Sequence, residues 1–334
     1  MLISYIIPAY NCAKTIANTV KSILFYNKSN DFEILIIENG STDNTPKVLG
    51  ILKEKYPCVK ILKSKKGASR ARNKGIDKSK GKWLWFVDAD DQINFDIKNI
   101  LIGLDNVDLI IGNYQSNNSK INLVETNKLV NKSVCDTFKL KMISDPTRYM
   151  TLWTKIFKAS IIKKYNIRLN NSLKVSEDSE FVFRYLLRCR SIFLLNKYIY
   201  LYSTLDTSTM RKAGLNSINY YTQAMCVMSK NLSKESYKLN KAIYKYICSN
   251  FFVSMVRGVF PNPHIKWKNK VYIVKKTKNI SVYENSFRNI GLSDIRENPK
   301  LVPAIFLKYN LTFIASIMLD IKAKINRQKE GKKS

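Results

Sequence analysis

The sequence contains a single histidine, His264, among 334 residues. One imidazole cannot supply the two histidines of a zinc-protease helix, so that class of site is excluded. The six cysteines lie far apart and form no C-x-x-C pair, which favours reduced thiols in a cytosolic protein. The segment 1–8 is too short for the apolar core of a signal peptide and runs directly into a strand-like pattern.

Acidic residues are scarce as well. Asp and Glu number 25 against 57 Lys and Arg, so the formal net charge is +32, while 45% of the residues are hydrophobic. That apolar fraction is ordinary for a folded chain and argues against wholesale disorder. The charge favours a polyanionic partner, which could be nucleic acid, an anionic membrane face or an acidic polymer.

The positive charge is concentrated towards the C-terminal end. Residues 1–110 carry 17 basic and 12 acidic side chains, a net charge of +5, whereas 111–210 carry +9 and 211–334 carry +18. We therefore expect chemistry in the first part of the chain and attachment to something anionic in the last.

Patterns of strands and helices alternate over the first 90 residues. Apolar runs predict strands over 2–8, 32–38, 59–62 and 82–88, and helical spacing covers 13–25, 44–56 and 68–78. This alternation indicates βαβ units, a mostly parallel sheet and thus an α/β fold. Ligands of such sheets bind at the carboxyl ends of the strands. The polar residues at those ends are Tyr10-Asn11, Glu38-Asn39-Gly40 and Asp88-Ala89-Asp90-Asp91.

The rest of the chain divides into a mixed part and a helical part. We expect strands over 108–112 and 192–202, helices over 153–165 and 178–189, and a loop over 115–120. After about residue 212 the sequence is rich in Lys, Tyr and Asn, and its pattern is helical without alternating strands.

The acidic run at 88–91 is the strongest chemical signal. Asp88 and Asp90 stand at i and i+2 just past a buried strand, so their carboxylates face the same cleft. Mg²⁺ typically takes one or two carboxylates together with substrate phosphates. A solvated acidic turn would give the same pattern, and D-x-D alone leaves both interpretations open.

Two further segments suit a nucleotide diphosphate. The run Glu38–Asp43 ends a strand and opens a helix, so it builds a second wall of the cleft, although as a helix cap alone it would be unremarkable. In the run Gly67–Gly75, small residues and two arginines stand where a helix is expected to begin. The N–H groups of a helix start and guanidinium groups both bind phosphate. A solvated basic helix face is the alternative for the second segment.

Adjacent acids, Glu177 and Asp178, precede a long apolar helix. They could simply stabilise the first helical turn through the helix dipole. They could instead supply a general base, since a chain with one histidine has carboxylates as its main candidates for activating a hydroxyl.

Together these segments resemble the family 2 glycosyltransferases, which transfer sugars from nucleotide-sugars and have a GT-A fold. The resemblance covers roughly residues 1–210, and six motifs in the right order make it specific. The matching pieces are IIPAYN (6–11), ENGSTDNT (38–45), GASRARNKGI (67–76), WFVDADD (85–91), LWTKIFK (152–158) and SEDSEF (176–181).

The resemblance assigns roles to individual residues. It implies Asp90 as a ligand of Mn²⁺ or Mg²⁺ and Asp178 as the base that deprotonates the acceptor, with Glu177 beside it. It places Trp153 and Lys155 at the acceptor. The implied binding residues for a nucleotide-sugar, expected to be UDP-linked, are Pro8, Ala9, Tyr10, Glu38, Asn39, Arg72, Asp88 and Ala89.

This sequence departs from the family pattern at two places. Many relatives carry Asp-Asp where this chain has Glu38-Asn39, and many carry His or Arg in a loop after the late strand. The loop here offers Asp206 as a candidate second metal ligand, and Arg211 or Lys212 as the diphosphate cation.

The resemblance also suggests a domain division. We expect a GT-A catalytic domain over 1–212, with its nucleotide-sugar half at about 1–110 and its acceptor half at about 111–212. A helical basic region then follows over 213–334.

The most apolar stretch, 301–321, contains too many polar residues for a membrane span. Polar residues recur every four positions, from Lys308 to Lys324, which predicts an amphipathic helix over about 303–327. Such a helix suits the interface of an anionic bilayer, and packing on the catalytic domain is the alternative.

We therefore expect an inverting glycosyltransferase that acts on a glycan acceptor, lipid-linked as in capsule or O-antigen synthesis. It would lie in the cytoplasm, peripheral on the inner face of an anionic membrane. A teichoic-acid-type polyphosphate acceptor is the alternative. A basic nucleic-acid-binding protein is a hypothesis from another class, but it leaves the acids at 88–91 unexplained, so we expect no nucleic acid as a partner.

Overall fold

The computed structural model describes residues 1–27, 31–116, 119–203, 214–232 and 236–331, and these residues form two compact units. The first unit comprises Met1–Phe138, Thr151–Ser172 and Glu177–Asp206, as far as they are described. The second unit comprises Lys139–Met150, Leu173–Ser176 and Thr207–Ser334, with the same restriction.

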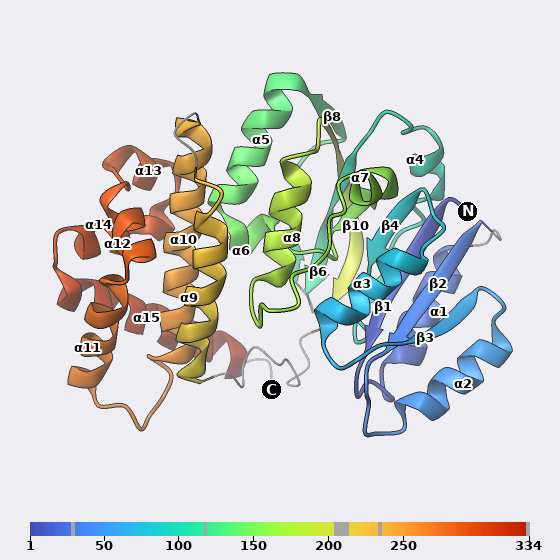
Figure 1. The fold of residues 1–334 in the computed structure, drawn as a ribbon, viewed down its shortest axis with the longest axis horizontal. Helices are drawn as coiled ribbons and strands as arrows, with labels where there is room; N and C mark the ends of the chain where they lie inside the picture. The colour runs from blue at the N-terminus through green and yellow to red at the C-terminus, as the bar shows by residue number, and fades with distance from the viewer. Residues whose placement is uncertain (28–30, 117–118, 204–213, 233–235, 332–334) are drawn as a thin grey trace. The chain divides into compact units, whose positions relative to one another are not determined.

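The first unit is built on one sheet, in the order β3-β2-β1-β4-β9-β6-β10-β5, with β7 paired to β6 and β8 paired to β10 (Figure 1). Strands β3, β2, β1 and β4 are parallel, as are β6 and β10, while β9 runs antiparallel between β4 and β6. The mostly parallel sheet is confirmed. The strands are β1 Ile3–Ala9, β2 Phe32–Glu38, β3 Val59–Lys63, β4 Trp83–Phe86, β5 Gln92–Ile93, β6 Leu109–Ser116, β7 Ser119–Ile121, β8 Lys128–Asn131, β9 Lys155–Lys158 and β10 Ser191–Tyr202.

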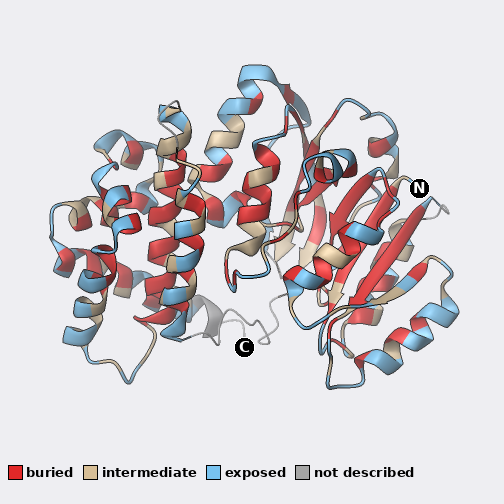
Figure 2. Cartoon of the chain, viewed as in Figure 1, coloured by how far each residue is buried: buried red, intermediate tan, exposed pale blue. Residues whose placement is uncertain are grey.

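Apolar runs explain why the first strands lie in the middle of this sheet. Six of the seven residues of β2 are buried, as expected for a parallel strand covered on both faces (Figure 2). The helices of this unit are α1 Ile16–Tyr26, α2 Thr45–Lys55, α3 Ala68–Lys78, α4 Lys98–Ile102, α7 Ala159–Lys164 and α8 Glu177–Leu186. A further helix, α5 Lys132–Ser144, has residues in both units.

Helix α3 lies unusually close to the sheet because of Gly75. A Cβ added at Gly75 would meet Cγ2 of Ile6 on β1 at 2.4 Å, so only glycine fits at this distance. Arg72 lies one turn earlier on the same buried face of the helix. The close approach of α3 therefore fixes where Arg72 reaches the sheet.

Two segments differ from the sequence-based expectation. The predicted helix over 153–165 begins as β9, because Ile156 and Phe157 are buried in pairs with β4 and β6 before α7 starts. The predicted loop over 115–120 is instead the end of β6 and the start of β7, with Gln115 paired to Lys120. In both places strand pairing overrides local composition.

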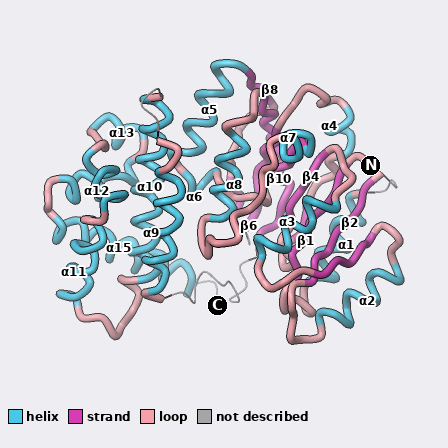
Figure 3. The backbone as a smooth tube through the Cα atoms, viewed as in Figure 1, coloured by secondary structure: helices cyan, strands magenta, loops and turns pink. Residues whose placement is uncertain are grey.

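The described part of the second unit is helical (Figure 3). Buried aromatic rings form its core, and Phe251 on α10 packs edge-on against Tyr283 and Phe287. Its helical segments are α6 Pro146–Tyr149, α9 Asn216–Ser229, α10 Tyr237–Gly258, α11 Trp267–Lys278, α12 Ser281–Arg288, α13 Leu292–Glu297, the 3₁₀ turn η2 Pro299–Leu301, α14 Val302–Lys308 and α15 Thr312–Gly331.

The expected amphipathic helix over 303–327 is two helices, α14 and α15. The chain turns between them at Asn310, which has a φ of 63° and accepts a hydrogen bond from Nζ of Lys278 at 2.7 Å. On α15, Thr312 and Ser316 of the polar stripe are buried, whereas Lys324 near its end is 71% exposed. None of the described helices combines the length and the apolar character that crossing a bilayer requires.

Candidate active site

The candidate site lies within the first unit, where β4 ends in the acidic turn. The backbone N–H of Asp91 donates to the carbonyl of Asp88 at 3.1 Å and closes this turn. Asp88 and Asp90 are half-buried on it, two positions apart, as expected from the sequence. Ala89 between them is buried, and its carbonyl accepts a hydrogen bond from Thr19 on α1.

Arg72 of α3 joins this turn to the start of α8. Its Nη2 lies 2.7 Å from Oδ1 of Asp88, and its Nη1 lies 3.1 Å from Oδ1 of Asp178. Burial opposes the charge of Arg72, but Asp178 and Asp88 outweigh it and raise the guanidinium pKa. Its Nε is buried and has no hydrogen-bond partner among the described residues.

Asp178 and Glu177 form the first turn of α8, as the sequence predicts. Burial, with Glu177 and Asp88 adding to it, raises the pKa of Asp178 to about 7, against the opposing effect of Arg72 and Lys155. A carboxylate with a pKa near neutrality is suited to accept a proton from a hydroxyl.

The two residues expected at the acceptor lie in different surroundings. Lys155 is fully buried, and its Nζ donates to the carbonyl of Thr151 at 2.7 Å and to Oγ1 of Thr154 at 3.2 Å. Burial lowers its pKa to about 7, although Asp178 opposes the shift. The charges of Lys155 and Asp178 therefore act on each other, and Lys155 does so from the interior of the unit rather than from an open surface.

Trp153 is half-buried and packs against aromatic residues of β10. Its ring stacks on Tyr200 and Tyr202, with centroids 4.8 and 5.3 Å apart, and Tyr114 meets it edge-on at 4.6 Å. The backbone carbonyl of Trp153 accepts a hydrogen bond from Nε1 of Trp85 at 2.8 Å. The indole is thus held in one orientation.

The loops after β1 and β2, where the sequence predicts the nucleotide wall, lie side by side, and the N–H of Asn11 donates to Oγ of Ser41 at 3.1 Å. Oε1 of Glu38 accepts the N–H groups of Gly40 and Ser41, so this carboxylate holds its own turn. Asn39 is buried, its N–H donates to the carbonyl of Ala9, and its Oδ1 has no partner among the described residues. An unpartnered buried oxygen is costly unless a ligand satisfies it.

Tyr10 continues the same wall from the end of β1, directly after Pro8 and Ala9. Its ring is 40% exposed, and Nζ of Lys66 donates to its hydroxyl at 2.8 Å. An exposed aromatic ring beside a lysine can stack a base and leaves a cation nearby for phosphate.

The donor set fits a divalent cation bound together with a diphosphate. Burial and the charge of Asp88 raise the pKa of Asp90, a repulsion that a bound cation would relieve. Its own backbone N–H donates to the Asp90 carboxylate, and among the described residues no group of three or more His, Cys, Asp or Glu could hold a metal ion by itself. Two carboxylates plus phosphate oxygens are the usual set for Mg²⁺. Asp206, with Arg211 and Lys212, lies outside the described residues.

Sequence reasoning missed Asp91 and Tyr200. Asp91 is buried, and its carboxylate accepts from the Tyr200 hydroxyl and from the N–H of Ser203, each at 2.7 Å. Burial, with Asp88, raises the pKa of Asp91 to about 8. The third acid of the run and the alternate tyrosines of β10 were the available signals.

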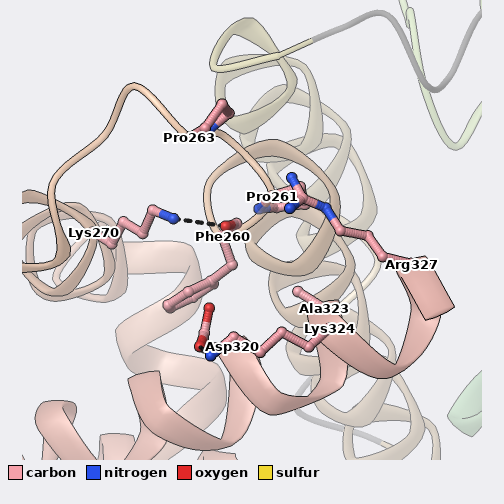
Figure 4. A pocket seen from close by; sticks show the side chains of 8 residues that line it. All are labelled: Phe260, Pro261, Pro263, Lys270, Asp320, Ala323, Lys324 and Arg327. Carbon is pink, nitrogen blue, oxygen red and sulfur yellow. Dashed lines mark hydrogen bonds and ion pairs between the residues drawn. The ribbon is translucent and has the colours of Figure 1, made fainter.

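A small pocket also lies in the second unit, away from all these residues in the sequence. Its volume is about 130 Å³, and Lys270, Lys324 and Arg327 give it a basic lining (Figure 4). Lys324 pairs with Asp320 at 2.8 Å, and Lys270 donates to the carbonyl of Phe260 at 2.7 Å.

Comparison with known proteins places these features in a family. The sequence pattern described as Glycosyl transferase family 2 matches residues 4–165. The chain is 24% identical over 327 residues to the poly(ribitol-phosphate) beta-N-acetylglucosaminyltransferase TarP of Staphylococcus aureus, covering 91% of this chain and 98% of TarP.

Two solved structures share the fold. The first is S. aureus TarS 1-349 in complex with UDP-GlcNAc, with a TM-score of 0.67 at 18% identity, over 99% of this chain and 92% of TarS 1-349. The second is the mannosyltransferase PcManGT from Pyrobaculum calidifontis in complex with GDP-Man and Mn²⁺, with a TM-score of 0.53 at 11% identity, over 96% and 86% of the two chains.

Proposed function

Because this chain belongs to glycosyl transferase family 2 and is a glycosyltransferase with a GT-A fold, we propose that it moves a sugar from a UDP-sugar to an acceptor hydroxyl with inversion. The observation that carries the proposal is the bridge through Arg72. One guanidinium contacts Asp88 of the acidic turn and Asp178 of α8, which are distant in the sequence. A nucleotide-side carboxylate and a candidate base therefore share one site.

In the proposed reaction Asp178 takes the proton of the acceptor hydroxyl while the hydroxyl oxygen attacks the anomeric carbon of the donated sugar. The bond from that carbon to the diphosphate breaks in the same displacement, so no covalent intermediate on the protein is needed. Glu177 and Lys155 set the charge around Asp178, and Trp153 borders the acceptor. This arrangement is general-base catalysis with a carboxylate.

On the donor side, Asp88 and Asp90 would hold Mn²⁺ or Mg²⁺, with Asp206 as a further candidate ligand. Such a cation neutralises charge on a departing diphosphate. The wall of Pro8, Ala9, Tyr10, Glu38 and Asn39 would bind the nucleoside, and the unpartnered Oδ1 of Asn39 supports this role. The unpartnered Nε of Arg72 likewise supports a diphosphate beside it.

For the acceptor we propose a polyol-phosphate polymer of the teichoic-acid class, with N-acetylglucosamine as the donated sugar. The support is the likeness to TarP along nearly its whole length and the net charge of +18 over residues 211–334. A polyphosphate is an anion that such a basic region attracts.

A lipid-linked glycan, as in capsule or O-antigen synthesis, remains a second candidate acceptor because of α15. Its exposed side includes Phe313, Ile317 and Ile321, which are 57%, 39% and 51% exposed. Basic residues flank this apolar arc, with Lys322 at one edge and Lys324 and Arg327 at the other. An apolar arc between basic edges is typical of a helix lying in the interface of an anionic membrane.

We accordingly propose a division of labour along the chain. Residues 1–212 would carry catalysis, and 213–334 would hold the enzyme at an anionic surface, peripheral on the cytoplasmic face of the membrane. No role for nucleic acid is proposed.

A transfer assay tests the function and the acceptor together. With labelled UDP-GlcNAc and Mn²⁺, we expect the full chain to label poly(ribitol phosphate) more efficiently than a lipid-linked disaccharide. Asp178→Asn should reduce transfer by roughly 10²–10⁴-fold, the usual worth of a general base. Glu180→Gln is the matched control on the same helix, since Glu180 pairs with Arg184 away from the site.

Each outcome of this assay has a definite meaning. Full transfer by Asp178→Asn would remove Asp178 as the base, and preferred labelling of the lipid-linked disaccharide would select the second acceptor. Donor hydrolysis with GDP- or dTDP-sugars but with no UDP-sugar would overturn the proposed nucleotide.

A further inference from the structure

A chain of buried hydrogen bonds connects the acidic turn to the end of β10. The N–H of Asp88 donates to the hydroxyl of Tyr200 at 3.0 Å, and that hydroxyl donates to Oδ2 of Asp91 at 2.7 Å. The other oxygen of Asp91 accepts the N–H of Ser203 at 2.7 Å. Tyr200 is 0% exposed and Asp91 is 1% exposed.

This chain reaches across the sheet rather than along it. Strands β9 and β6 lie between β4 and β10 in the strand order, while β5, directly after Asp91, pairs with Tyr200 and Leu201 of β10. The Tyr200 hydroxyl adds a contact to the backbone of Asp88 itself, and stacking on Trp153 holds its ring in place.

Burying a carboxyl group whose partners are all uncharged costs a protein desolvation free energy. Asp91 has no ion pair among the described residues, and its hydrogen-bond partners are a hydroxyl and a backbone N–H. Two residues of the same turn, Asp88 and Asp90, are the proposed ligands of the donor complex. The orientation of their carboxylates depends on the backbone of the turn, which Asp91 and Tyr200 hold by hydrogen bonds.

We propose that Asp91 and Tyr200 are positioning residues for the donor complex, which fix the backbone at Asp88 and so orient the carboxylates of Asp88 and Asp90. The inference rests on the proposed metal-assisted function. Through Ser203, the same pair ties the acidic turn to the point where β10 ends. Both side chains are buried, so both act through the turn.

The test measures Mn²⁺ binding to the full chain in the presence of UDP, by electron paramagnetic resonance of free Mn²⁺. Tyr200→Phe keeps the stacked ring and removes the hydroxyl, and we expect it to weaken Mn²⁺ binding at least tenfold. Asp91→Ala should weaken it similarly, and Asp91→Asn, which keeps one oxygen acceptor, should lie between Asp91→Ala and the unaltered chain. UDP affinity without metal should change less than twofold.

Tyr5→Phe is the matched control. Tyr5 is another fully buried tyrosine of this sheet, and its hydroxyl contacts Asn27 rather than the acidic turn. We expect Tyr5→Phe to lower the melting temperature about as much as Tyr200→Phe while leaving Mn²⁺ affinity unchanged. If Tyr200→Phe and Tyr5→Phe both lower the melting temperature and both keep full Mn²⁺ affinity, the positioning role is wrong.

The same titration separates the inference from the function beneath it. Failure of the unaltered chain to bind Mn²⁺ with UDP would overturn the metal-assisted function, and the positioning role with it. Normal binding by the unaltered chain and by all three site variants would overturn the positioning role alone.

Discussion

At the residue scale, the site is organised around charge. Arg72 brings one positive charge to two carboxylates, Asp88 and Asp178, and it is itself buried. Ion pairs of this kind cost desolvation energy and persist where geometry and further hydrogen bonds compensate. Arg72 contacts Oδ1 of Asp178, and the raised pKa of about 7 leaves this carboxyl group poised between charged and neutral near pH 7.

The acid limb of the pH profile should report Asp178. A base works only when deprotonated, so a pKa of about 7 means that kcat/KM falls as the pH drops below 7, roughly tenfold per pH unit. The charge of Lys155 lowers this pKa, so Lys155→Met should move the limb to higher pH. Profiles of kcat/KM between pH 5 and 9 check both statements. An unmoved limb would show that Lys155 does not act on Asp178.

At the element scale, local pattern predicts the first half of the sheet well. Strand β2 over 32–38 and helix α3 over 68–78 have the predicted bounds. The apolar run and the helical spacing in these segments agree with the tertiary environment. The pattern fails at β9, where Lys155, a charged residue, sits fully buried in a strand. Pairing with β4 and β6 decides that segment, and no local signal encodes it.

The candidate site follows the same rule. Asp88, Asp90 and Asp178 stand in short contiguous motifs, and the structure places Asp88 and Asp178 on one arginine. The link between Asp91 and Tyr200 joins residues that are 109 positions apart in the sequence. A contact of that kind depends on the fold as a whole, so sequence patterns could not supply it.

The close packing of α3 leads to a prediction about Gly75. In Gly75→Ala the new Cβ would lie 2.4 Å from Cγ2 of Ile6 and 3.1 Å from Cδ1 of Ile37, so the helix must shift away from the sheet. We expect a loss of about 1–3 kcal/mol in the free energy of unfolding, as for other overpacked cores. Transfer activity should fall as well, because the same helix carries Arg72. Denaturant unfolding and the transfer assay measure both effects.

Gly50→Ala is the control for that experiment. Gly50 lies on α2, and a Cβ there meets nothing within 4 Å. Replacing a helical glycine without a clash should stabilise the protein by about 0.5–1 kcal/mol. Equal stability changes in the two variants would mean that the packing of α3 tolerates a side chain at 75.

At the scale of the whole molecule, the net charge of +32 is distributed unevenly along the chain. Residues 1–110 carry only +5, and three of their 12 acidic residues stand in the turn at 88–91. The excess of +18 after residue 210 accompanies a helical region whose last helix exposes apolar residues between basic ones. The basic pocket lined by Lys270, Lys324 and Arg327 adjoins one edge of this arc on α15. A second copy of so basic a face would bring like charges together, whereas an anionic surface would neutralise them.

Vesicle flotation tests this assignment on the full chain. We expect binding to vesicles with 30% anionic phospholipid and little binding to neutral ones, since each basic residue near the surface adds about 1 kcal/mol. Ile317→Glu with Ile321→Glu should reduce the bound fraction at least tenfold, because both residues are exposed on the apolar arc. Ile51→Glu with Ile102→Glu, two exposed isoleucines of the first unit, should bind as the unaltered chain does. If the α15 variant instead changes the mass of the protein in solution and leaves flotation intact, the arc joins copies of this chain, and the membrane assignment is wrong.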